Sequence, residues 1–479
     1  WGIDRMKSMI RERADWCISR QRRWGLPIPV FYCADCGKPV CTDETIEAVS
    51  ALFAEKGSNA WFEMDAADIL PKGFACPHCG KSAGFTKEED TLDGWFDSGS
   101  THFAAMKKDQ GFWPATMYLE GLDQYRGWFQ SSLLTAVGAF GEGAPFKECV
   151  THGWTVDGEG RAMHKSLGNG VDPADIFNEN GADILRLWAA SADYHADVRC
   201  SKAIFQQLSQ NYLKFRNTCK FMLDNLVDFD PTHLTKAEDM PVLDRWLITK
   251  LNELVEKVEQ SYNDYEFHII THAVNDFCVT TLSSFYLDIV KDRLYCEAAD
   301  SAERRSAQTA LYLTLSTLAK LFAPLLAFTC DEIWLAMPHT AEDDARNVVL
   351  NDMNKPFTAY ALDAETMARW EHIIEVRTAV NGALEEARAA KVIGKSLEAD
   401  VHLTVPEGDV FLADENPAAL ADLFIVSKVE LTVGGELAVK VENAAGTKCP
   451  RCWKHSLTPN AEGLCPRCAE VVRHLPDLL

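Results

Sequence analysis

The chain has 479 residues, 47% of them hydrophobic and 25% charged, and a formal net charge of −24. These values predict two to four globular domains with ample cores. No apolar run exceeds about ten residues, which excludes a membrane-spanning helix. The acidic charge argues weakly against nucleic-acid binding, although basic patches at 5–23 and 448–474 oppose it locally. Because the chain begins at Trp1, without an initiator methionine or a signal peptide, we expect a soluble, monomeric, cytoplasmic fragment.

The N-terminal segment predicts a basic helix over 1–13, a turn over 16–25 and a strand over 28–32. Its arginines alternate with aromatic residues, a composition typical of nucleic-acid contacts. Alternatively, Trp16 and Trp24 belong to a core and the arginines form a solvated face.

Two Cys-x-x-Cys pairs follow, each with a glycine directly after its second cysteine. Four thiolates in this pattern are typical of a tetrahedral zinc site. The gap of 39 residues between the pairs is long, and Cys41 is a spare ligand candidate. Four unligated thiols are the alternative. Helices at 43–56 and 60–70 complete a predicted insertion over 30–85. The candidate ligands are Cys33, Cys36, Cys76 and Cys79.

The acidic and aromatic stretch 93–100 is a candidate amino-acid pocket. Trp95 would pack against a branched aliphatic side chain, while the neighbouring carboxylates would hold an ammonium group. An ordinary buried tryptophan is the alternative.

A strand ending at Leu119 and a helix over 126–140 flank the turn 120–124. This is the strand-to-helix crossover of a dinucleotide fold, which places ligands at the carboxyl ends of strands. Asp123 would accept a ribose hydroxyl, Gly121 would let a nucleotide approach the backbone, and the helix would offer free N–H groups. A capped helix start is the alternative.

A second loop follows the apolar run 148–150. The hairpin-like turn 157–160 delivers Lys165 and Ser166 on a glycine-flanked loop. A lysine in such a loop suits triphosphate chemistry.

Helical apolar spacing begins near Ile204 and predicts a bundle. Pro231 and Pro241 mark breaks in it. Polar residues such as Asn211, Arg216 and Asn217 are only guesses for RNA contacts. The predicted stripes are 208–222, 243–258 and 267–289, with further helices at 304–322, 331–337 and 364–390.

Alternating strands at 401–405 and 429–432, with a helix at 417–424, predict a small α/β module. The Gly394-Lys395-Ser396 string resembles a phosphate-binding loop. We reject that interpretation because Ala389 occupies the position of the leading glycine.

Two identical Cys-Pro-Arg-Cys pairs, twelve residues apart, end the chain at zinc-ribbon spacing. Trp453, His455 and the neighbouring Arg451, Lys454 and Arg467 suit RNA bases and phosphates. A purely structural clip for a short tail is the alternative. The candidate ligands are Cys449, Cys452, Cys465 and Cys468.

Met163, Lys165 and Ser166 match three positions of the Lys-Met-Ser-Lys-Ser loop, so the chain resembles the class I aminoacyl-tRNA synthetases. The Gly121-x-Asp123-Gln124 string matches the adenylate-binding turn of that family. The strings 93–100 and 123–129 are similar to its bacterial isoleucine-specific branch. The resemblance covers nearly the whole chain, which would be a C-terminal half.

This resemblance implies that ATP and isoleucine form isoleucyl-adenylate, whose acyl group then passes to the 3′-terminal adenosine of tRNA(Ile). ATP would act with Mg²⁺, and two zinc ions would be bound. Lys165 and Ser166 would be catalytic, within an ATP loop of Ala162, Met163, His164, Lys165 and Ser166. The implied adenylate contacts are Trp95, Glu120, Gly121, Asp123, Gln124 and His152.

Two positions depart from the family pattern. Ala162 replaces the first loop lysine and His164 replaces a serine. A lost cation at a preorganised site costs about 3 kcal/mol, and Arg161 is the candidate substitute. Because the first nucleotide loop and the editing insertion are absent, we expect no pyrophosphate exchange from this chain alone.

Three other functions are weighed against this one. A valyl or leucyl relative is disfavoured by the 95–100 string and the zinc tail. A non-catalytic tRNA-binding zinc protein is possible for a chain without the upstream half. A zinc hydrolase is disfavoured because both four-cysteine sets are coordinatively closed.

The predicted organisation is multidomain. A Rossmann-like second half of a catalytic domain spans 1–203, a helical anticodon-binding domain 204–385, an α/β junction module 386–445 and a zinc-binding domain 446–479.

Overall fold

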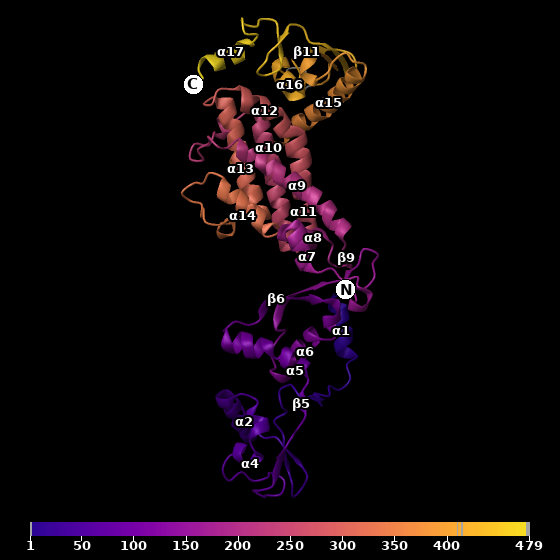
Figure 1. Ribbon diagram of the computed structural model, residues 1–479, viewed down its shortest axis with the longest axis vertical. Helices are drawn as coiled ribbons and strands as arrows, with labels where there is room; N and C mark the ends of the chain where they lie inside the picture. The colour runs from indigo at the N-terminus through magenta and orange to yellow at the C-terminus, as the bar shows by residue number, and fades with distance from the viewer. Residues whose placement is uncertain (1, 410, 413–414, 476–479) are drawn as a thin grey trace. The chain divides into compact units, whose positions relative to one another are not determined.

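The computed structural model describes residues 2–409, 411–412 and 415–475, so Trp1 of the predicted first helix and residues 476–479 of the predicted tail lie outside it (Figure 1). The described chain divides into two compact units. The first comprises 1–155 with 194–197, and the second comprises 156–193 with 198–479. No helix in the described ranges has the length and apolar character needed to cross a membrane.

The first unit combines short strands with short helices. Its α-helices are α1 (Gly2–Arg11), α2 (Asp43–Lys56), α3 (Ala60–Glu63), α4 (Ala66–Ile69), α5 (Gly94–Gly99) and α6 (Trp128–Leu133). Its strands are β1 (Ser19–Arg20), β2 (Phe31–Cys33), β3 (Pro39–Val40), β4 (Phe85–Lys87), β5 (Thr91–Leu92), β6 (Ala115–Gly121) and β7 (Phe146–His152), with β8 (Thr155–Val156) at its border. The π-helices η1 (His102–Asp109) and η3 (Leu134–Ala139) and the 3₁₀ turn η2 (Leu122–Tyr125) complete it.

The predicted crossover is present. Strands β6 and β7 are parallel neighbours, and η2, α6 and η3 connect them. Tyr118 is buried, and its ring stacks on Trp128 at 4.1 Å between ring centres. This contact holds the connecting helix on the strand pair, so both strand ends have a fixed position.

The insertion between the first cysteine pairs has its own core. Strands β3, β2 and β4 form an antiparallel sheet, and Phe31 and Trp61 lie at its centre with 0% and 1% exposure. The predicted helix 43–56 matches α2, which Thr42 caps. The predicted helix 60–70 is two short helices instead, α3 and α4.

The N-terminal arm is only partly as expected. The helix ends at Arg11, and the predicted strand 28–32 begins only at Phe31. Trp24 is 92% exposed, so placing it in a core was wrong. Trp16 is half-buried and donates a hydrogen bond to Asp93.

The second unit holds a helical bundle. Its helices are α7 (Pro173–Asn180), α8 (Ala182–Ser191), α9 (Lys202–Asp224), α10 (Val242–Asn263), α11 (Phe267–Asp276), α12 (Leu287–Cys296), α13 (Ala302–Phe322), α14 (Ala327–Ala336) and α15 (Ala364–Ala389). A π-helix, η6 (Phe277–Tyr286), joins α11 to α12. Short 3₁₀ turns are η4 (Lys165–Leu167), η5 (Ala237–Asp239), η7 (Val348–Leu350) and η8 (Thr358–Tyr360), and β9 (Val198–Arg199) precedes α9.

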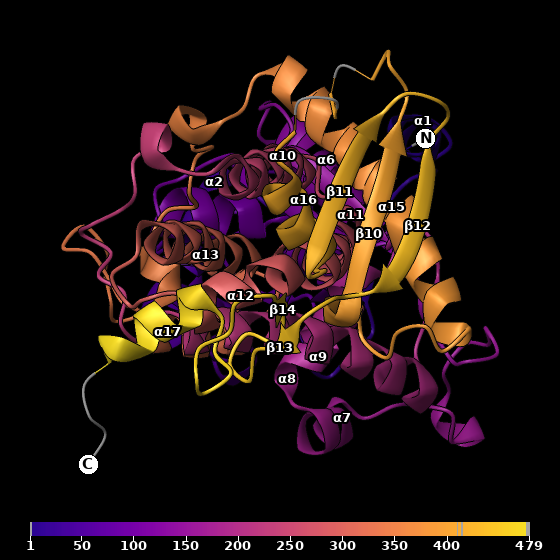
Figure 2. The same cartoon turned by 90° about the horizontal axis from the view of Figure 1, so that it is seen from above.

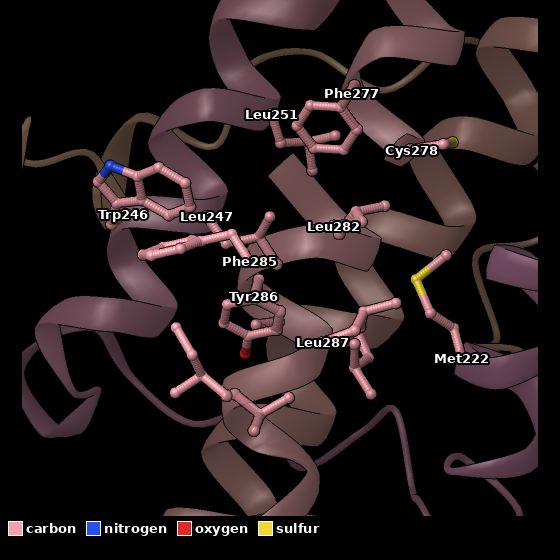
Figure 3. Close-up of a cluster of buried hydrophobic side chains, with 14 of the residues drawn as sticks. Met222, Trp246, Leu247, Leu251, Phe277, Cys278, Leu282, Phe285, Tyr286 and Leu287 are labelled. Carbon is pink, nitrogen blue, oxygen red and sulfur yellow. The ribbon is translucent and has the colours of Figure 1, made fainter. Parts of the chain in front are cut away.

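The bundle core is built from the predicted apolar stripes (Figure 3). Leu247, Leu251 and Val258 of α10 are fully buried. Buried Asp244 accepts hydrogen bonds from Tyr286, Arg293 and Ser306, so this charge is paired inside the core.

An α/β module and a tail follow the bundle. The module contains η9 (Ser396–Glu398), β10 (Ala399–Val405), α16 (Pro417–Phe424), β11 (Lys428–Val433) and β12 (Ala438–Asn443). Figure 2 shows its strands in the order β11, β10, β12. Strand β12 was missing from the sequence prediction. The tail contains β13 (Thr447–Lys448), β14 (His455–Ser456) and α17 (Pro466–Arg473).

In the Gly394-Lys395-Ser396 string, whose interpretation as a phosphate-binding loop was rejected, two backbone N–H groups are already hydrogen-bonded within the chain. The Glu398 carboxylate accepts hydrogen bonds from the backbone N–H groups of Gly394 and Lys395 at 3.0 and 3.2 Å. These amides are therefore already paired with an anion.

Candidate functional site

The carboxyl ends of β6 and β7 bring several predicted site residues together. Gly121 lies opposite His152 in the strand register, and Glu120 lies opposite Thr151. A Cβ atom on Gly121 would approach Asp123 Oδ1 to 3.0 Å and His152 Cε1 to 3.5 Å. Glu120, Asp123 and His152 are exposed, so their polar groups face solvent around one strand end. This arrangement suits a ligand bound over the end of a parallel sheet.

The predicted free N–H groups after Gln124 are partly taken. Gln124 Oε1 accepts a hydrogen bond from the backbone N–H of Trp128 at 2.9 Å, which caps the start of α6. Gln124 Nε2 also donates to Asp123 Oδ2 at 3.2 Å. The expectation of an open helix terminus was therefore wrong at Trp128, because the side chain of the turn itself occupies that donor.

Trp95 lies on α5, against the same turn. A Cβ atom on Gly127 would come within 2.9 Å of Trp95 Cη2 and 2.5 Å of Gln124 Oε1. A side chain at position 127 would therefore force Gln124 or Trp95 to move. The Trp95 side chain is 45% exposed, so it is not an ordinary core tryptophan.

Asp93 connects the N-terminal arm to α5, and sequence reasoning missed this role. Its buried carboxylate accepts hydrogen bonds from Trp16 Nε1 at 3.0 Å and Arg20 Nη2 at 2.7 Å. It also caps α5 through the N–H of Trp95. One turn later, Asp97 Oδ1 is buried without a hydrogen-bond partner among the described residues. Burial, and then the charge of Asp93, raise the pKa of Asp97.

The second predicted loop belongs to the other compact unit, and Asp157 fixes its turn. The Asp157 carboxylate accepts hydrogen bonds from Asn169 Nδ2, the Arg161 backbone N–H and Arg161 Nε, each at 2.9 Å. The Asn169 amide and then the Arg161 N–H hold the pKa of Asp157 well below its usual range. The turn is completed by Gly160, whose φ of 84° suits glycine.

Within this loop, Met163 packs against a buried cluster, whereas Lys165 and Ser166 are exposed to solvent. Met163 is half-buried and packs against a cluster that contains Ile176, Ile184 and Phe205. Lys165 and Ser166 are exposed, and no described residue forms an ion pair with Lys165. The loop therefore has a fixed apolar point next to a free ammonium group.

The suggested substitute for the missing loop lysine is not a free cation. Arg161 pairs with Asp157 at 2.9 Å and with Glu159 at 3.2 Å. His164 contributes its backbone N–H to Asn169 Oδ1 at 2.9 Å, and its exposed side chain is left toward solvent. Neither residue restores the absent positive charge.

The first cysteine set forms one cluster. The sulfur atoms of Cys33, Cys36, Cys76 and Cys79 all lie within 4.8 Å of one another, with two separations of 3.7 Å. A zinc ion bound to four thiolates at about 2.3 Å separates the sulfurs by about 3.8 Å. The donor set therefore fits zinc. Cys41 is exposed and lies outside the cluster, so it is not the spare ligand that was considered.

The tail cysteines form a second cluster of the same kind. Their four sulfurs also lie within 4.8 Å of one another, and Cys452 and Cys465 are 3.8 Å apart. Arg451 Nη1 lies 3.7 Å from Cys468 Sγ, within reach of an N–H···S hydrogen bond. Such contacts from a cation neutralise part of the thiolate charge. This cluster also fits zinc, with ligands Cys449, Cys452, Cys465 and Cys468.

The predicted RNA-facing cations of the tail are largely engaged within the chain. Arg467 pairs with Asp292 and Glu297. Lys454 pairs with Asp422, and Arg451 donates to the carbonyls of the α12 end. The expectation of a free basic surface was therefore wrong for these three side chains, since carboxylates pair with Arg467 and Lys454, and backbone carbonyls at the end of α12 accept from Arg451. Trp453 remains 52% exposed.

Two family profiles match the chain. The profile described as tRNA synthetases class I (I, L, M and V) matches residues 1–201. The profile described as the anticodon-binding domain of tRNA ligase matches residues 244–403. Together they cover the strand pair with its cysteine insertion and most of the bundle.

Similar proteins agree with these profiles. The isoleucine–tRNA ligase of Moorella thermoacetica is 48% identical and covers 99% of this chain, which corresponds to 53% of that protein. The isoleucine–tRNA ligase of Carboxydothermus hydrogenoformans is 49% identical over 100% of this chain and 53% of its own length. The chain thus spans about half the length of the curated relatives that it matches.

Solved structures support the fold. The LeuRS of Agrobacterium radiobacter K84, in a ternary complex with tRNA and LeuAMS, aligns over 90% of this chain and 46% of that one, with a TM-score of 0.55 and 17% identity. The methionyl-tRNA synthetase of Mycobacterium tuberculosis, in complex with methionyl-adenylate, aligns over 70% and 57% with a TM-score of 0.50 and 16% identity. The chain therefore belongs to the class I aminoacyl-tRNA synthetases and corresponds to the C-terminal half of their isoleucine-specific members.

Proposed function

We propose that this chain supplies the second half of an isoleucine–tRNA ligase, which uses ATP to form isoleucyl-adenylate and then charges tRNA(Ile). The observation that carries the proposal is the meeting of Gly121, Asp123 and His152 at the ends of β6 and β7. The names of the relatives favour isoleucine over valine as the substrate. A cytoplasmic location and a monomeric state belong to the same proposal.

In this proposal the strand ends hold the adenylate. Glu120 and Gly121 lie beside His152, so backbone and side-chain groups of both strands meet one ligand. Asp123 would accept the ribose hydroxyl groups, and its contact with Gln124 orients its carboxylate. Trp95 would pack against the aliphatic side chain of the amino acid. Positioning of this kind accelerates a reaction that needs no covalent protein intermediate.

The loop of the second unit would act on the triphosphate. Lys165 has a free ammonium group and Ser166 is exposed beside it, so both can meet phosphate oxygens together with Mg²⁺. Asp157 and Met163 would act as positioning residues, since they hold the turn and the anchored end of the loop.

Zinc would have a structural role at both cysteine clusters, because four thiolates leave no open coordination position. The domain boundaries expected from the sequence, at 203, 385 and 445, remain part of the proposal. The bundle would bind the anticodon part of tRNA(Ile), in keeping with the matched profile.

The test joins this chain to the N-terminal half that its relatives carry and measures isoleucine-dependent pyrophosphate exchange. Lys165→Ala should lower the exchange rate about a hundred- to thousandfold, with isoleucine affinity little changed. Lys147→Ala is the matched control, because Lys147 is exposed at the opposite end of β7. An unchanged rate in Lys165→Ala would remove this residue from the triphosphate site. Exchange with valine but not isoleucine would favour a valyl ligase.

A further inference from the structure

The two π-helices of the first unit, η1 and η3, meet at His102. This residue begins η1, which follows α5 in the chain, and η3 packs against α5. The His102 side chain is 2% exposed, and its ring meets the Phe140 ring edge-on at 6.0 Å between ring centres. π-Helical turns are rare and often occur at functional sites. A buried histidine that joins two of them is therefore a candidate for a role beyond packing.

Two hydrogen bonds fix the state of the His102 ring. Trp113 Nε1 donates to His102 Nδ1 at 3.3 Å. An indole N–H group is only a donor, so Nδ1 must carry a lone pair and the ring proton lies on Nε2. His102 Nε2 lies 3.1 Å from Thr135 Oγ1 and therefore donates to this hydroxyl oxygen. The imidazole is neutral in this arrangement, and both of its nitrogens are used.

The Thr135 hydroxyl connects His102 to α5. Its single hydrogen has three carbonyl oxygens within reach, those of Gly99 at 2.7 Å, Ser131 at 3.0 Å and Ser132 at 3.1 Å. Both serine carbonyls belong to the helix that continues into Thr135, whereas Gly99 is the last residue of α5. The Gly99 carbonyl is the nearest of the three, and hydrogen bonds in a chain strengthen one another. The hydroxyl hydrogen is therefore assigned to Gly99, which joins α5 to η3.

Trp95 lies four residues before Gly99 on the same six-residue helix. The Ser98 carbonyl of this helix accepts a further hydrogen bond from Trp128 Nε1 at 2.9 Å. The packing is close, since a Cβ atom on Gly99 would approach Ser131 to 2.8 Å. A helix of this length moves as one piece, so the hydrogen bond at Gly99 also sets the position of the Trp95 ring.

We infer that His102 is a positioning residue, which holds Trp95 in place through Thr135 and the last turn of α5. The contact of Trp95 with an amino acid rests on the proposed function. The link from His102 to Trp95 rests only on the hydrogen bonds within the first unit.

Acid should release this link. A second ring proton would lie on Nδ1, where it would face the Trp113 N–H group and break that hydrogen bond. Burial lowers the pKa of His102, while Glu142 raises it and Lys107 lowers it. These two charged residues, which pair with each other, are the ones that act on the ring within the described ranges. The folded chain thus binds this proton less tightly than the unfolded chain, so the link should be intact at neutral pH and weaken below about pH 6.5.

The test places a fluorine reporter on tryptophan. The chain is labelled with 5-fluorotryptophan, and the ¹⁹F resonance of Trp95 is the one that Trp95→Phe removes. Thr135→Val should shift this resonance, and His102→Leu should shift it in the same direction. The double variant should add little to either single change, because both break one chain of hydrogen bonds. His102→Gln, whose amide N–H can replace the Nε2–H donor, should keep the parent position.

Thr101→Val is the matched control. The exposed Thr101 hydroxyl also donates to a carbonyl of α5, that of Ser98 at 2.7 Å, but it lies outside the chain from His102 to Gly99. We expect this variant to leave the Trp95 resonance in place. An equal shift in Thr101→Val and Thr135→Val would overturn the inference, as would a Trp95 resonance that Thr135→Val leaves unchanged.

A pH titration of the same resonance separates His102 from its neighbours. Between about pH 7 and pH 5 the Trp95 resonance of the parent chain should move, and that of His102→Gln should stay constant. A shift that persists in His102→Gln would come from Asp97, whose pKa is raised by burial, and would overturn the acid release of the link.

Kinetics of the enzyme joined to its N-terminal half test the consequence for the amino acid. Thr135→Val should raise the KM for isoleucine about tenfold and change the maximal exchange rate less, since a displaced Trp95 weakens amino-acid binding. An unchanged KM in a variant that moves Trp95 would overturn the positioning role. If the joined parent enzyme shows no isoleucine-dependent exchange, the proposed function fails. The ¹⁹F measurements on the present chain then still decide whether His102 positions Trp95.

Discussion

The two cysteine clusters use the same backbone turn in different surroundings. In the first cluster the N–H of Gly37 donates to Cys33 O, and that of Gly80 donates to Cys76 O, each at 2.8 Å. In the tail the N–H of Trp453 donates to Cys449 O at 2.9 Å. Each of these three residues directly follows the second cysteine of its Cys-x-x-Cys pair. All three have left-handed φ angles, between 67° and 75°.

The surroundings differ in what holds each cluster. The first cluster has its own apolar core around Phe31 and Trp61, and Cys79 is exposed. The tail core consists mainly of the cysteines themselves with Leu464 and Cys296 of α12. Arg451 and Arg467 hold this tail on α12 of the bundle. The same ligand motif can thus be an independent module in one place and a docked segment in another.

The two clusters should differ most in how much of the chain unfolds when one cysteine ligand is replaced. Cys449→Ser and Cys76→Ser should each lower the zinc content from about two to about one per chain, measured by elemental analysis. Hydrogen exchange should then show loss of amide protection over 446–475 and the end of α12 in the first variant, and over 31–87 alone in the second. Loss of protection throughout the bundle in both variants would contradict the distinction.

The second difference concerns Arg451. Arg451→Ala removes the N–H donor to Cys468 and should weaken zinc binding at the tail about tenfold, since partners of metal ligands tune affinity by 10- to 100-fold. Competition with a chelator measures this value. Arg473→Ala serves as the control, because Arg473 pairs only with Glu470 among the described residues. Equal zinc loss in both variants would exclude a role for Arg451.

A smaller effect is expected from the left-handed residue. Trp453→Gly should relieve about 1 kcal/mol of backbone strain, because Trp453 has a left-handed φ angle. It also removes the contact in which Lys395 lies 5.0 Å from the indole ring, so we expect only a slight net stabilisation. Gly80→Ala should instead destabilise the first cluster by about 1 kcal/mol. Thermal unfolding of the zinc-loaded chain checks both signs. A destabilised Trp453→Gly would show that the contacts of the indole ring outweigh the relief of strain.

The smallest difference between the two clusters is expected in the pH dependence of their zinc uptake. Burial raises the pKa of Cys76, but the backbone N–H groups of His78 and Cys79 outweigh it and bring this pKa to about 6. Cys449 reaches about 6 in the same way, through the N–H groups of Cys452 and Cys465. The pKa values of the partner ligands Cys79 and Cys452 are raised instead, so zinc uptake by the metal-free chain must release protons and should weaken at both clusters as pH falls. Dissimilar midpoints for the two clusters would contradict this similarity.

The helices were the most predictable part of the fold. The apolar stripe of Leu247, Leu251 and Val258 is buried as expected, because one face of a long helix must pack against the core. Strand β12 was missed because only Val439 and Val441 alternate on a polar edge strand, which gives a weak pattern. The π-helix at 277–286 was also missed, since its register depends on packing and not on composition.

The candidate site was proposed where a short motif carries it. Gly121, Asp123 and Lys165 were proposed from local sequence, and the structure leaves the side chains of Asp123 and Lys165 exposed. Asp93 was missed because its partners Trp16 and Arg20 are 77 and 73 residues away. The tail cations were misassigned for the same reason, since the partners of Arg451 and Arg467 lie in or directly after α12 and the partner of Lys454 lies on α16. Pairing of distant charges is a property of the fold, which local composition does not report.

The docking of Arg467 on α12 has a consequence for how the chain varies among relatives. Its guanidinium faces Asp292 and Glu297, which are 24% and 19% exposed. Replacing Arg467 alone would leave two neighbouring carboxylates to repel each other next to the cysteine cluster. Substitutions at positions 292, 297 and 467 should therefore occur together, so an alignment of relatives would show the tail and α12 covarying as one inherited unit.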